Sequence, residues 1–402
     1  MEILSPAGNL DKLKTAVQYG ADAVYCGIGK FSLRTAADNF TFDELCEGID
    51  FAHKNGRKVY ITANAIPHEG DMDSFRSICE QAIAANADAL IISDLGAFDI
   101  ASEYKNKIAL HVSTQASNTN SRSMNVWHRM GASRIVLARE LSFDEIREIR
   151  KNISPELELE MFVHGAMCMS YSGRCLISNY LTARDSNRGA CAQPCRWKYY
   201  LTEEKRPGEY MQITEDDNGT FLFNSKDLCL INYLPEIAQL GVNSLKIEGR
   251  MKSSYYAAIV TKAYRQALDD YYKNPSAPID PYYYEELCKV SHRDYYTGFS
   301  FGKPDKDGQI YGYNSYIRDC DIVGVVIKNC GDYYIVEQRN KFYDGDELEI
   351  VPPVERFFVQ KIEGLCDENG NRIESAPHSK MLLRIKIDRD VPPGTIIRKP
   401  VE

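Results

Sequence analysis

The stretch Glu158-Leu-Glu-Met-Phe-Val-His164-Gly-Ala-Met-Cys168 runs from an apolar strand pattern directly into an array of cysteines. Four cysteines lie close together in this array, at Cys168, Cys175, Cys191 and Cys195, and the gaps between them are six, fifteen and three residues. Thiolates are soft ligands that bind zinc or iron–sulfur clusters. The other eight of the twelve cysteines are spread singly, so we interpret the array as a metal site, against the alternative of four unrelated structural thiols.

The spacing of the four cysteines discriminates between the two kinds of metal site. A gap of six residues is longer than the short knuckles of a zinc ribbon, and the tight triplet of a bacterial ferredoxin is absent. Glycines and serines between the cysteines permit sharp turns and supply hydrogen-bond donors to sulfur. We therefore favour an iron–sulfur cluster and keep zinc as the alternative.

Seven further short apolar runs surround this stretch, and each is followed by a helical pattern. They are Glu2–Leu4, Ala23–Cys26, Lys58–Thr62, Ala89–Ile92, Ile108–Val112, Arg134–Leu137 and Ser244–Ile247. Before four of the runs, Gly20, Asn86, Gly131 or Gly241 is expected to end a helix in the left-handed conformation. Eight strands alternating with helices predict an α/β fold, and the regularity favours a closed (β/α)8 TIM-like barrel over an open doubly wound sheet.

The order of the patterns predicts two domains and a connector. We expect the TIM-like barrel catalytic domain over residues 1–273, with an inserted cysteine-cluster and hairpin segment at 166–225. The Tyr- and Pro-rich residues 274–320 are expected to pack on the barrel, with binding of bases as the alternative. Residues 321–402 contain short strand patterns separated by turns, which predict a small C-terminal β-barrel domain.

Two local predictions concern the inserted segment. Residues 198–202 and 221–223 are expected to pair as a hairpin, with Asp217-Asn-Gly219 as the turn signal. A helix is expected from Asn224-Ser225 to about Leu240.

Composition limits the compartment and the partners. No apolar run approaches the roughly 20 residues of a membrane span, and the first residues read as a strand and not as a signal peptide. Together with the many free cysteines, this predicts a cytoplasmic protein without a membrane partner. The net charge of −9 disfavours a general nucleic-acid coat, although residues 174–198 carry five cations against Asp185 alone.

In a barrel, chemistry takes place where the strands end. The polar side chains at the predicted strand ends include Asn64, Gln115, Arg139, His164, Glu248 and Arg250. Lys246 and Glu248 point to the same side of the last strand because strand side chains alternate. These two residues form either a structural ion pair or a catalytic pair.

The segments Glu160-Met-Phe-Val-His-Gly165-Ala-Met-Cys168 and Gly173-Arg-Cys175-Leu-Ile-Ser178 closely resemble the signature of the collagenase-like peptidases, peptidase family U32. Ser5-Pro-Ala-Gly8 and Lys246-Ile-Glu-Gly-Arg250 match as well, and the resemblance spans nearly the whole chain. It implies an oxygen-independent hydroxylase with a 4Fe–4S cluster on the four clustered cysteines. The length and the short C-terminal domain look most like the prephenate-dependent group that forms 5-hydroxyuridine at the tRNA wobble position.

The resemblance implies roles for the residues at the barrel mouth. Prephenate is a dicarboxylate, which arginine forks bind with paired hydrogen bonds. The candidates for substrate binding are Arg34, Arg139, Arg188 and Arg250, with Gln115 and Asn64 as orienting groups. The catalytic candidates are Lys246, Glu248 and His164, and His164 is otherwise a donor to the cluster or an ordinary buried histidine. The basic segment with Trp197 is expected to hold an extruded anticodon base, or Trp197 shields the cluster from solvent.

Two other functions remain open. A peptidase is one, although the sequence contains neither the His-Glu-x-x-His zinc motif nor the Gly-x-Ser-x-Gly elbow. A non-catalytic RNA-binding or redox-sensing protein with a structural cluster is the other. A second family member or a second copy of the chain is a further possible partner.

Overall fold

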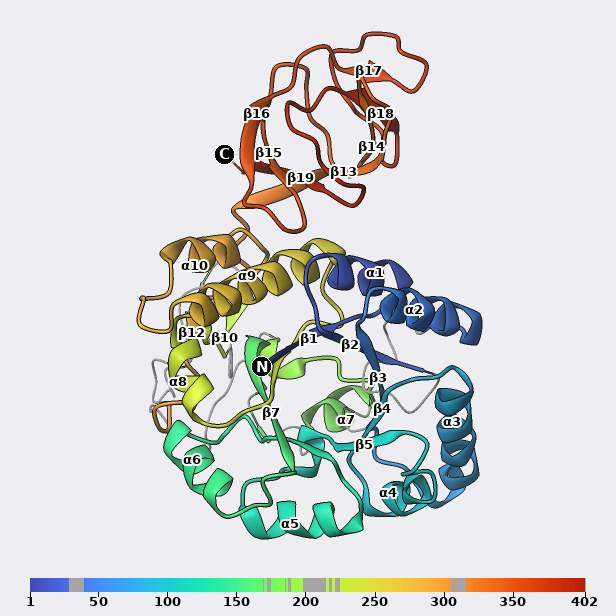
Figure 1. The fold of residues 1–402 in the computed structure, drawn as a ribbon, viewed down its shortest axis with the longest axis vertical. Coiled ribbons are helices and arrows are strands. Elements are labelled where there is room, and N and C mark those ends of the chain that lie inside the picture. The colour runs from blue at the N-terminus through green and yellow to red at the C-terminus, as the bar shows by residue number, and fades with distance from the viewer. Residues whose placement is uncertain are drawn as a thin grey trace.

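The computed structural model describes most of the 402-residue chain. It covers residues 1–28, 40–168, 170–171, 175–184, 186, 189–197, 215–216, 219–220, 225–304, 308 and 316–401. A large barrel of strands and helices carries a smaller domain of strands at one side (Figure 1). None of the helices in these ranges is long and apolar enough to cross a lipid bilayer.

Eight parallel strands close into the barrel. They are β1 (Glu2–Pro6), β2 (Ala23–Gly27), β3 (Lys58–Ala63), β4 (Ala89–Ile92), β5 (Ala109–Val112), β6 (Arg134–Val136), β7 (Glu158–Ala166) and β11 (Ser244–Ile247). The strand β11 pairs in parallel with both β1 and β7, so the ring has no open edge. The predicted closed barrel is confirmed, and the open doubly wound sheet is wrong.

Helices cover the outside of the barrel. They are α1 (Leu10–Gln18), α2 (Phe42–Lys54), α3 (Met72–Ala84), α4 (Leu95–Ser102), α5 (Ser121–Met130), α6 (Phe143–Lys151), α8 (Leu234–Gln239) and α9 (Ser254–Lys273). Thr41 and Ser142 begin α2 and α6 with complete capping boxes. The four predicted left-handed positions all have positive φ, from 62° at Asn86 to 113° at Gly131. Each lets the chain turn back into the next strand, as the sequence indicates.

The segment after β7 differs from the prediction. It contains α7 (Ile177–Thr182), η5 (Pro194–Arg196), β8 (Glu215–Asp216), β9 (Gly219–Thr220) and β10 (Asp227–Cys229). The strands β8 and β9 pair antiparallel, whereas residues 198–202, 217–218 and 221–223, on which the predicted hairpin and its turn depend, lie outside the described residues.

The helix expected from Asn224-Ser225 to Leu240 is wrong in its first half. The strand β10 pairs antiparallel with the end of β7, a short η6 (Ile231–Tyr233) follows, and α8 begins only at Leu234. The physical reason is tertiary, because the buried carboxylate of Asp227 accepts hydrogen bonds from the guanidinium of Arg293 at 2.5 and 3.0 Å. Arg293 lies 66 residues further along the chain.

The connector and the second domain complete the fold. The connector contains α10 (Pro281–Cys288) and β12 (Tyr295–Tyr296), and β12 extends the barrel sheet beside β10. The second domain contains β13 (Cys320–Asn329), β14 (Tyr334–Gln338), β15 (Glu347–Val351), β16 (Phe358–Lys361), β17 (Cys366–Asp367), β18 (Leu382–Ile385) and β19 (Ile396–Pro400). These strands form one antiparallel sheet in the order β16-β15-β19-β13-β14-β18-β17, a half-barrel with its own apolar core.

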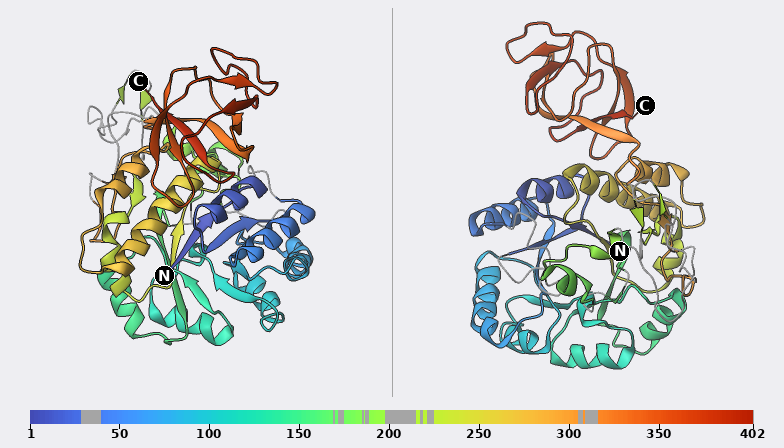
Figure 2. Two further views of the ribbon diagram at one scale, coloured as in Figure 1. Left: turned by 45° about the horizontal axis from the view of Figure 1, so that its top comes forward. Right: turned by 180° about the vertical axis from the view of Figure 1, so that it is seen from behind.

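Charged side chains join the two domains. Arg398 of β19 is fully buried, and its guanidinium contacts the carboxylates of Glu286 at 2.7 Å and Glu349 at 2.6 Å. The hydroxyl of Tyr19 donates to the carbonyls of Val351 and Gly394, both at 3.0 Å. The β domain therefore sits against α1, α9 and α10, beside the barrel wall (Figures 1 and 2).

Candidate active site at the barrel mouth

A small polar cavity of about 50 Å³ lies at the carboxyl ends of the barrel strands. It is lined by Tyr25, Thr62, Asn64, Ser113, Thr114, Gln115, Arg139, Phe162, Lys246, Glu248 and Arg250. Six of the predicted site residues are in this lining: Asn64, Gln115, Arg139, Lys246, Glu248 and Arg250. The structure therefore brings together residues that are up to 186 positions apart in the sequence (250 − 64), while their chemical roles remain predictions.

Three cations and one carboxylate line the cavity. The buried guanidinium of Arg250 donates to the hydroxyl of Thr62 at 2.9 Å. That of Arg139 donates to the carbonyl of Ala166 at 2.8 Å and lies 4.7 Å from the ring centroid of Phe162. Lys246 is the third cation, and Glu160 pairs with it at 2.7 Å. Arg139 and Arg250 against Glu248 therefore leave a net positive charge, and the cavity suits an anionic group of a small ligand.

Two amide side chains add hydrogen-bonding groups to the lining. The Asn64 amide donates to the hydroxyl of Ser113 at 3.0 Å. The Oε1 atom of Gln115 is buried and has no hydrogen-bond partner within the described part of the chain. Buried acceptors are normally satisfied, so this oxygen is suited to accept a hydrogen bond from a ligand.

Glycines let the loops around the cavity approach each other. Gly165 lies near the end of β7 with φ of 107°, and a Cβ there would lie 2.5 Å from the carbonyl oxygen of Glu248. A Cβ on Gly8 would lie 2.6 Å from the carbonyl oxygen of Arg250. Any larger residue at either position would push the Glu248–Arg250 turn away from the cavity.

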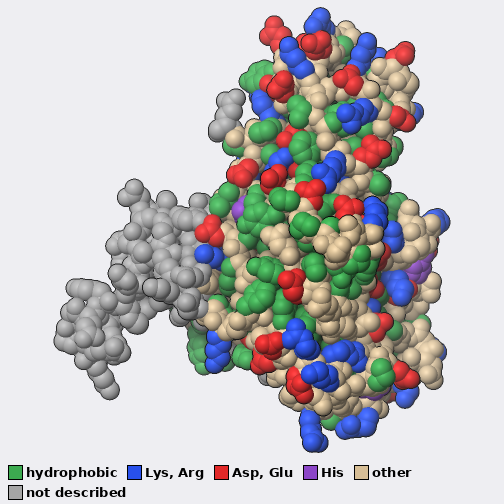
Figure 3. Space-filling model, turned by 60° about the vertical axis from the view of Figure 1, so that its left-hand side comes forward, with side chains coloured by type: hydrophobic (Ala, Val, Ile, Leu, Met, Phe, Trp, Pro, Cys, Tyr) green, Lys and Arg blue, Asp and Glu red, His purple; other side chains and the backbone are tan. Residues whose placement is uncertain are grey.

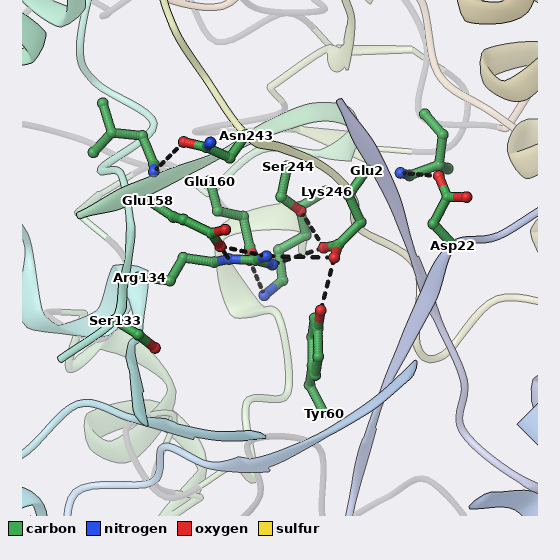
Figure 4. Close-up of polar contacts among 12 residues, drawn as sticks. Glu2, Asp22, Tyr60, Ser133, Arg134, Glu158, Glu160, Asn243, Ser244 and Lys246 are labelled. Atoms are coloured by element: carbon green, nitrogen blue, oxygen red, sulfur yellow. Dashed lines mark hydrogen bonds and ion pairs between the residues drawn. The ribbon is translucent and has the colours of Figure 1, made fainter. Parts of the chain in front are cut away.

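The floor of the cavity is a buried ion network (Figure 4). Lys246 forms an ion pair with Glu160 at 2.7 Å, and Glu160 also contacts Arg134 at 3.1 Å. Arg134 in turn contacts Glu2 at 2.6 Å. Sequence reasoning missed Glu160, Arg134 and Glu2, although the alternation that places Lys246 inside the barrel could have identified Glu160 on β7.

His164 lies outside the cavity, on the other face of β7. Its ring packs among Tyr256, Tyr264 and Tyr295 at centroid distances of 5.9, 5.6 and 5.2 Å. Burial lowers the pKa of His164 to about 3, so the ring is neutral at physiological pH. The His164 ring thus lies apart from the side chains of Lys246 and Glu248 that line the cavity, which favours the interpretation as a buried histidine over that as a proton donor.

A register shift explains the position of His164. Phe162 pairs with Lys246, but the next residue of β11, Ile247, pairs with His164, so β7 has one extra residue at this point. Strict alternation would place His164 on the inner face with Glu160 and Phe162. The extra residue turns it to the outer face instead. Arg34 and Arg188 lie outside the described residues.

Contacts within the described parts of the cysteine segment link its helix α7 to the residues around Cys191 and Cys195. Cys168 is exposed, and Cys175, Cys191 and Cys195 are partly buried free thiols. The backbone amide of Gln193 donates to Cys191 Sγ at 3.4 Å, and that of Ala192 donates to Ser178 in α7 at 3.0 Å. The helix α7 also contacts η5, which contains Cys195.

The donor chemistry of this segment suits a soft metal centre, because it offers four thiols and an amide directed at sulfur. In the described residues, however, no group of three or more His, Cys, Asp or Glu side chains is arranged to hold a metal ion. The prediction that the four sulfurs meet at one point therefore stays a prediction.

The closed barrel with a cation-lined cavity at its strand ends defines the class as a TIM-barrel protein with a candidate site at the strand ends. The chain belongs to peptidase family U32: the family model matches residues 8–310, and that of the Peptidase family U32 C-terminal domain matches residues 318–398.

Three relatives match nearly the full length. "tRNA hydroxylation protein P1" of Bacillus subtilis is 41% identical, with 99% of this chain and 94% of the relative covered. "tRNA hydroxylation protein P" of Escherichia coli is 38% identical, with 97% and 94% covered. "Collagenase" of Porphyromonas gingivalis is 30% identical, with 90% and 89% covered.

Proposed function

We propose that the protein is a tRNA-modifying hydroxylase. One observation carries this proposal: relatives named as tRNA hydroxylation proteins match both the barrel and the β domain, at 41% and 38% identity. The finer proposal is that the product is 5-hydroxyuridine at the wobble position, made without molecular oxygen and with prephenate as the donor.

The cavity supports a carboxylate-bearing donor. Arg139 and Arg250 present planar guanidinium groups that can bind a carboxylate through two parallel hydrogen bonds. Lys246 adds a third positive charge on the cavity floor. Gln115 Oε1 is then available to accept a hydrogen bond from a hydroxyl of the same ligand. In this arrangement the residues that line the cavity bind and orient the donor.

A 4Fe–4S cluster on Cys168, Cys175, Cys191 and Cys195 belongs to the same proposal, with zinc as the alternative. When bound, such a cluster supplies a redox-active or Lewis-acidic centre at the barrel mouth. Ligand thiols commonly reach their final geometry only with the metal, because metal binding is coupled to local folding. The contact between α7, which begins two residues after Cys175, and η5, which contains Cys195, supports this proposal.

The cysteine segment also has features of an RNA-binding surface. Tyr180 is 82% exposed, and Tyr171 and Trp197 are 47% and 42% exposed. Exposed aromatic rings stack with unpaired bases, and Arg184 is a neighbouring exposed cation. By contrast, the face of the barrel and β domain in Figure 3 has basic and acidic side chains interspersed. We therefore propose that the anticodon region binds at the segment.

The peptidase alternative is supported by the relative named "Collagenase". Among the described residues that line the cavity there is no cysteine or histidine, so neither a Cys–His nor a Ser–His nucleophile pair is formed there.

The test is nucleoside analysis of tRNA from a strain in which this gene and any redundant hydroxylase gene are deleted. Wobble 5-hydroxyuridine should disappear and return with the wild-type gene. Persistence of the modified nucleoside would refute the proposal. A purified protein that cleaves collagen after all four cysteines are replaced by serine would favour the peptidase instead.

A further inference from the structure

The ammonium of Lys246 lies in a defined setting on the cavity floor. Its Nζ atom is 4.5 Å from the ring centroid of Tyr25 and 5.5 Å from that of Phe162, and both rings line the cavity. Lys246 is buried, and its one ion pair within the described chain is with Glu160, at 2.7 Å. Aromatic faces and a carboxylate both favour a charged ammonium.

Two cations inside the barrel hold the Glu160 carboxylate in place. Its side chain is fully buried, Oε1 accepts from Lys246 and Oε2 accepts from Arg134 at 3.1 Å. Arg134 is anchored independently by Glu2 at 2.6 Å and by Glu158 at 2.7 Å. Because its two oxygens bind different cations, the Glu160 carboxylate cannot rotate without breaking an ion pair. Figure 4 shows how the ion pairs connect Glu2 through Arg134 and Glu160 to Lys246.

We propose that Glu160 is a positioning residue that fixes Lys246 as a permanent cation at the base of the cavity. Lys246 then binds the anionic group of the ligand and does not serve as a general base. Lys246 is oriented from the barrel interior, by Glu160, and not by its strand neighbour Glu248. The catalytic consequence rests on the proposed function, whereas the charge state of Lys246 does not.

The charge state can be measured directly on the full-length protein. With lysine labelled at the ε-carbon with ¹³C, the Lys246 signal is assigned by its absence in Lys246→Arg, and its chemical shift is followed against pH. Within the described residues, the titratable and charged groups around Lys246 are Glu160, Tyr25, His111, Arg134, Arg139, Glu248 and Arg250. Glu160→Gln removes one negative charge and keeps the shape of the side chain.

We expect the ε-carbon signal of Lys246 to depend on pH differently in Glu160→Gln than in wild type, because a buried ammonium loses its counter-ion. Glu158→Gln is the matched control, since Glu158 pairs with the same Arg134 but is 44% exposed and makes no contact with Lys246. An equal pH dependence in wild type and Glu160→Gln, or equal changes in both variants, would overturn the proposal.

A second variant covers the case in which Glu160→Gln does not fold. Glu160→Asp keeps the charge but withdraws the carboxylate by one methylene, so Lys246 should stay charged yet lose its orientation. In the hydroxylation assay we expect KM for prephenate to rise about tenfold with a smaller change in kcat. An unchanged KM would contradict the positioning role. If wild-type protein has no hydroxylase activity, the proposed function fails, and the NMR titration still decides the charge state of Lys246.

Discussion

Replacing Arg398 by methionine should destabilise the junction between the barrel and the β domain. The side chain is fully buried and contacts Glu286, Glu349 and the hydroxyl of Tyr255. Without Arg398, the carboxylates of Glu286 and Glu349, which are only 5% and 11% exposed, share a single cation. That cation is Lys289, which lies 3.2 Å from Glu286 and 3.0 Å from Glu349. One buried negative charge is then uncompensated.

The expected cost follows from that charge. Breaking a buried ion pair by removing one partner costs about 3–5 kcal/mol, and the remaining lysine places this variant near the lower end, about 3 kcal/mol. Urea unfolding of the full chain, followed by far-UV circular dichroism, measures the change. Arg356→Met is the matched control at the same junction, because Arg356 pairs with Asp280 while 52% exposed, and a surface pair contributes about 1 kcal/mol or less.

A compensating variant tests the cause of the destabilisation. Adding Glu286→Gln and Glu349→Gln to Arg398→Met removes the uncompensated charge, so at least half of the lost stability should return. A loss below about 1 kcal/mol for Arg398→Met, or no recovery in the triple variant, would refute the reasoning.

The remaining predictions concern the cysteine segment, the cavity and His164. Cys191→Ser should reduce the iron content of anaerobically purified protein and abolish product formation. Cys330→Ser, at an exposed thiol in the β domain, should change neither. Equal iron content in both variants would argue against the cluster. Arg250→Lys should raise KM for the carboxylate donor about tenfold because lysine cannot form a paired fork, and an unchanged KM would exclude Arg250 from binding. His164→Gln should lower product formation less than about tenfold, since loss of a general acid costs about 10²-fold or more. The folded-state pKa of His164, about 3, lies below the ordinary value of 6.5, so the neutral ring stabilises the fold above pH 6.5 and that stability is lost as pH falls toward 3. The stability of His164→Gln, measured by urea unfolding at several pH values, should therefore fall less steeply across this range, and an identical slope would contradict the burial argument.

Much of the barrel could be predicted because its signals are local. A left-handed residue such as Gly131 ends a helix just before each of four strands, and the strand patterns are short and apolar. Once the strands are assigned, the barrel geometry alone predicts that their carboxyl ends meet at one mouth. This is why Asn64, Gln115, Arg139 and Arg250 could be grouped from the sequence, although nothing local connects them.

The features that could not be predicted depend on distant partners. Residues after Asn224 have the composition of a helix, yet Asp227–Cys229 form β10 because Asp227 pairs with Arg293 and the strand pairs with β7. The local helix propensity of these residues is outweighed by the tertiary contacts, which are the buried Asp227–Arg293 ion pair and the strand pairing with β7. The side chain of Glu160 is similar, since only the closed barrel shows that its partners are Lys246 and Arg134.

One backbone irregularity in β7 separates the side chains that face the cavity from the His164 ring outside it. Up to Phe162 its alternate residues face the barrel interior, where Glu160 holds Lys246. The extra residue before His164 reverses the alternation, so the histidine packs against the tyrosines of α9 and the chain leaves the barrel toward Cys168. Without the register shift, a histidine would occupy the cavity beside three cations, where protonation would be opposed by like charges. The shift therefore keeps the His164 side chain out of the cavity.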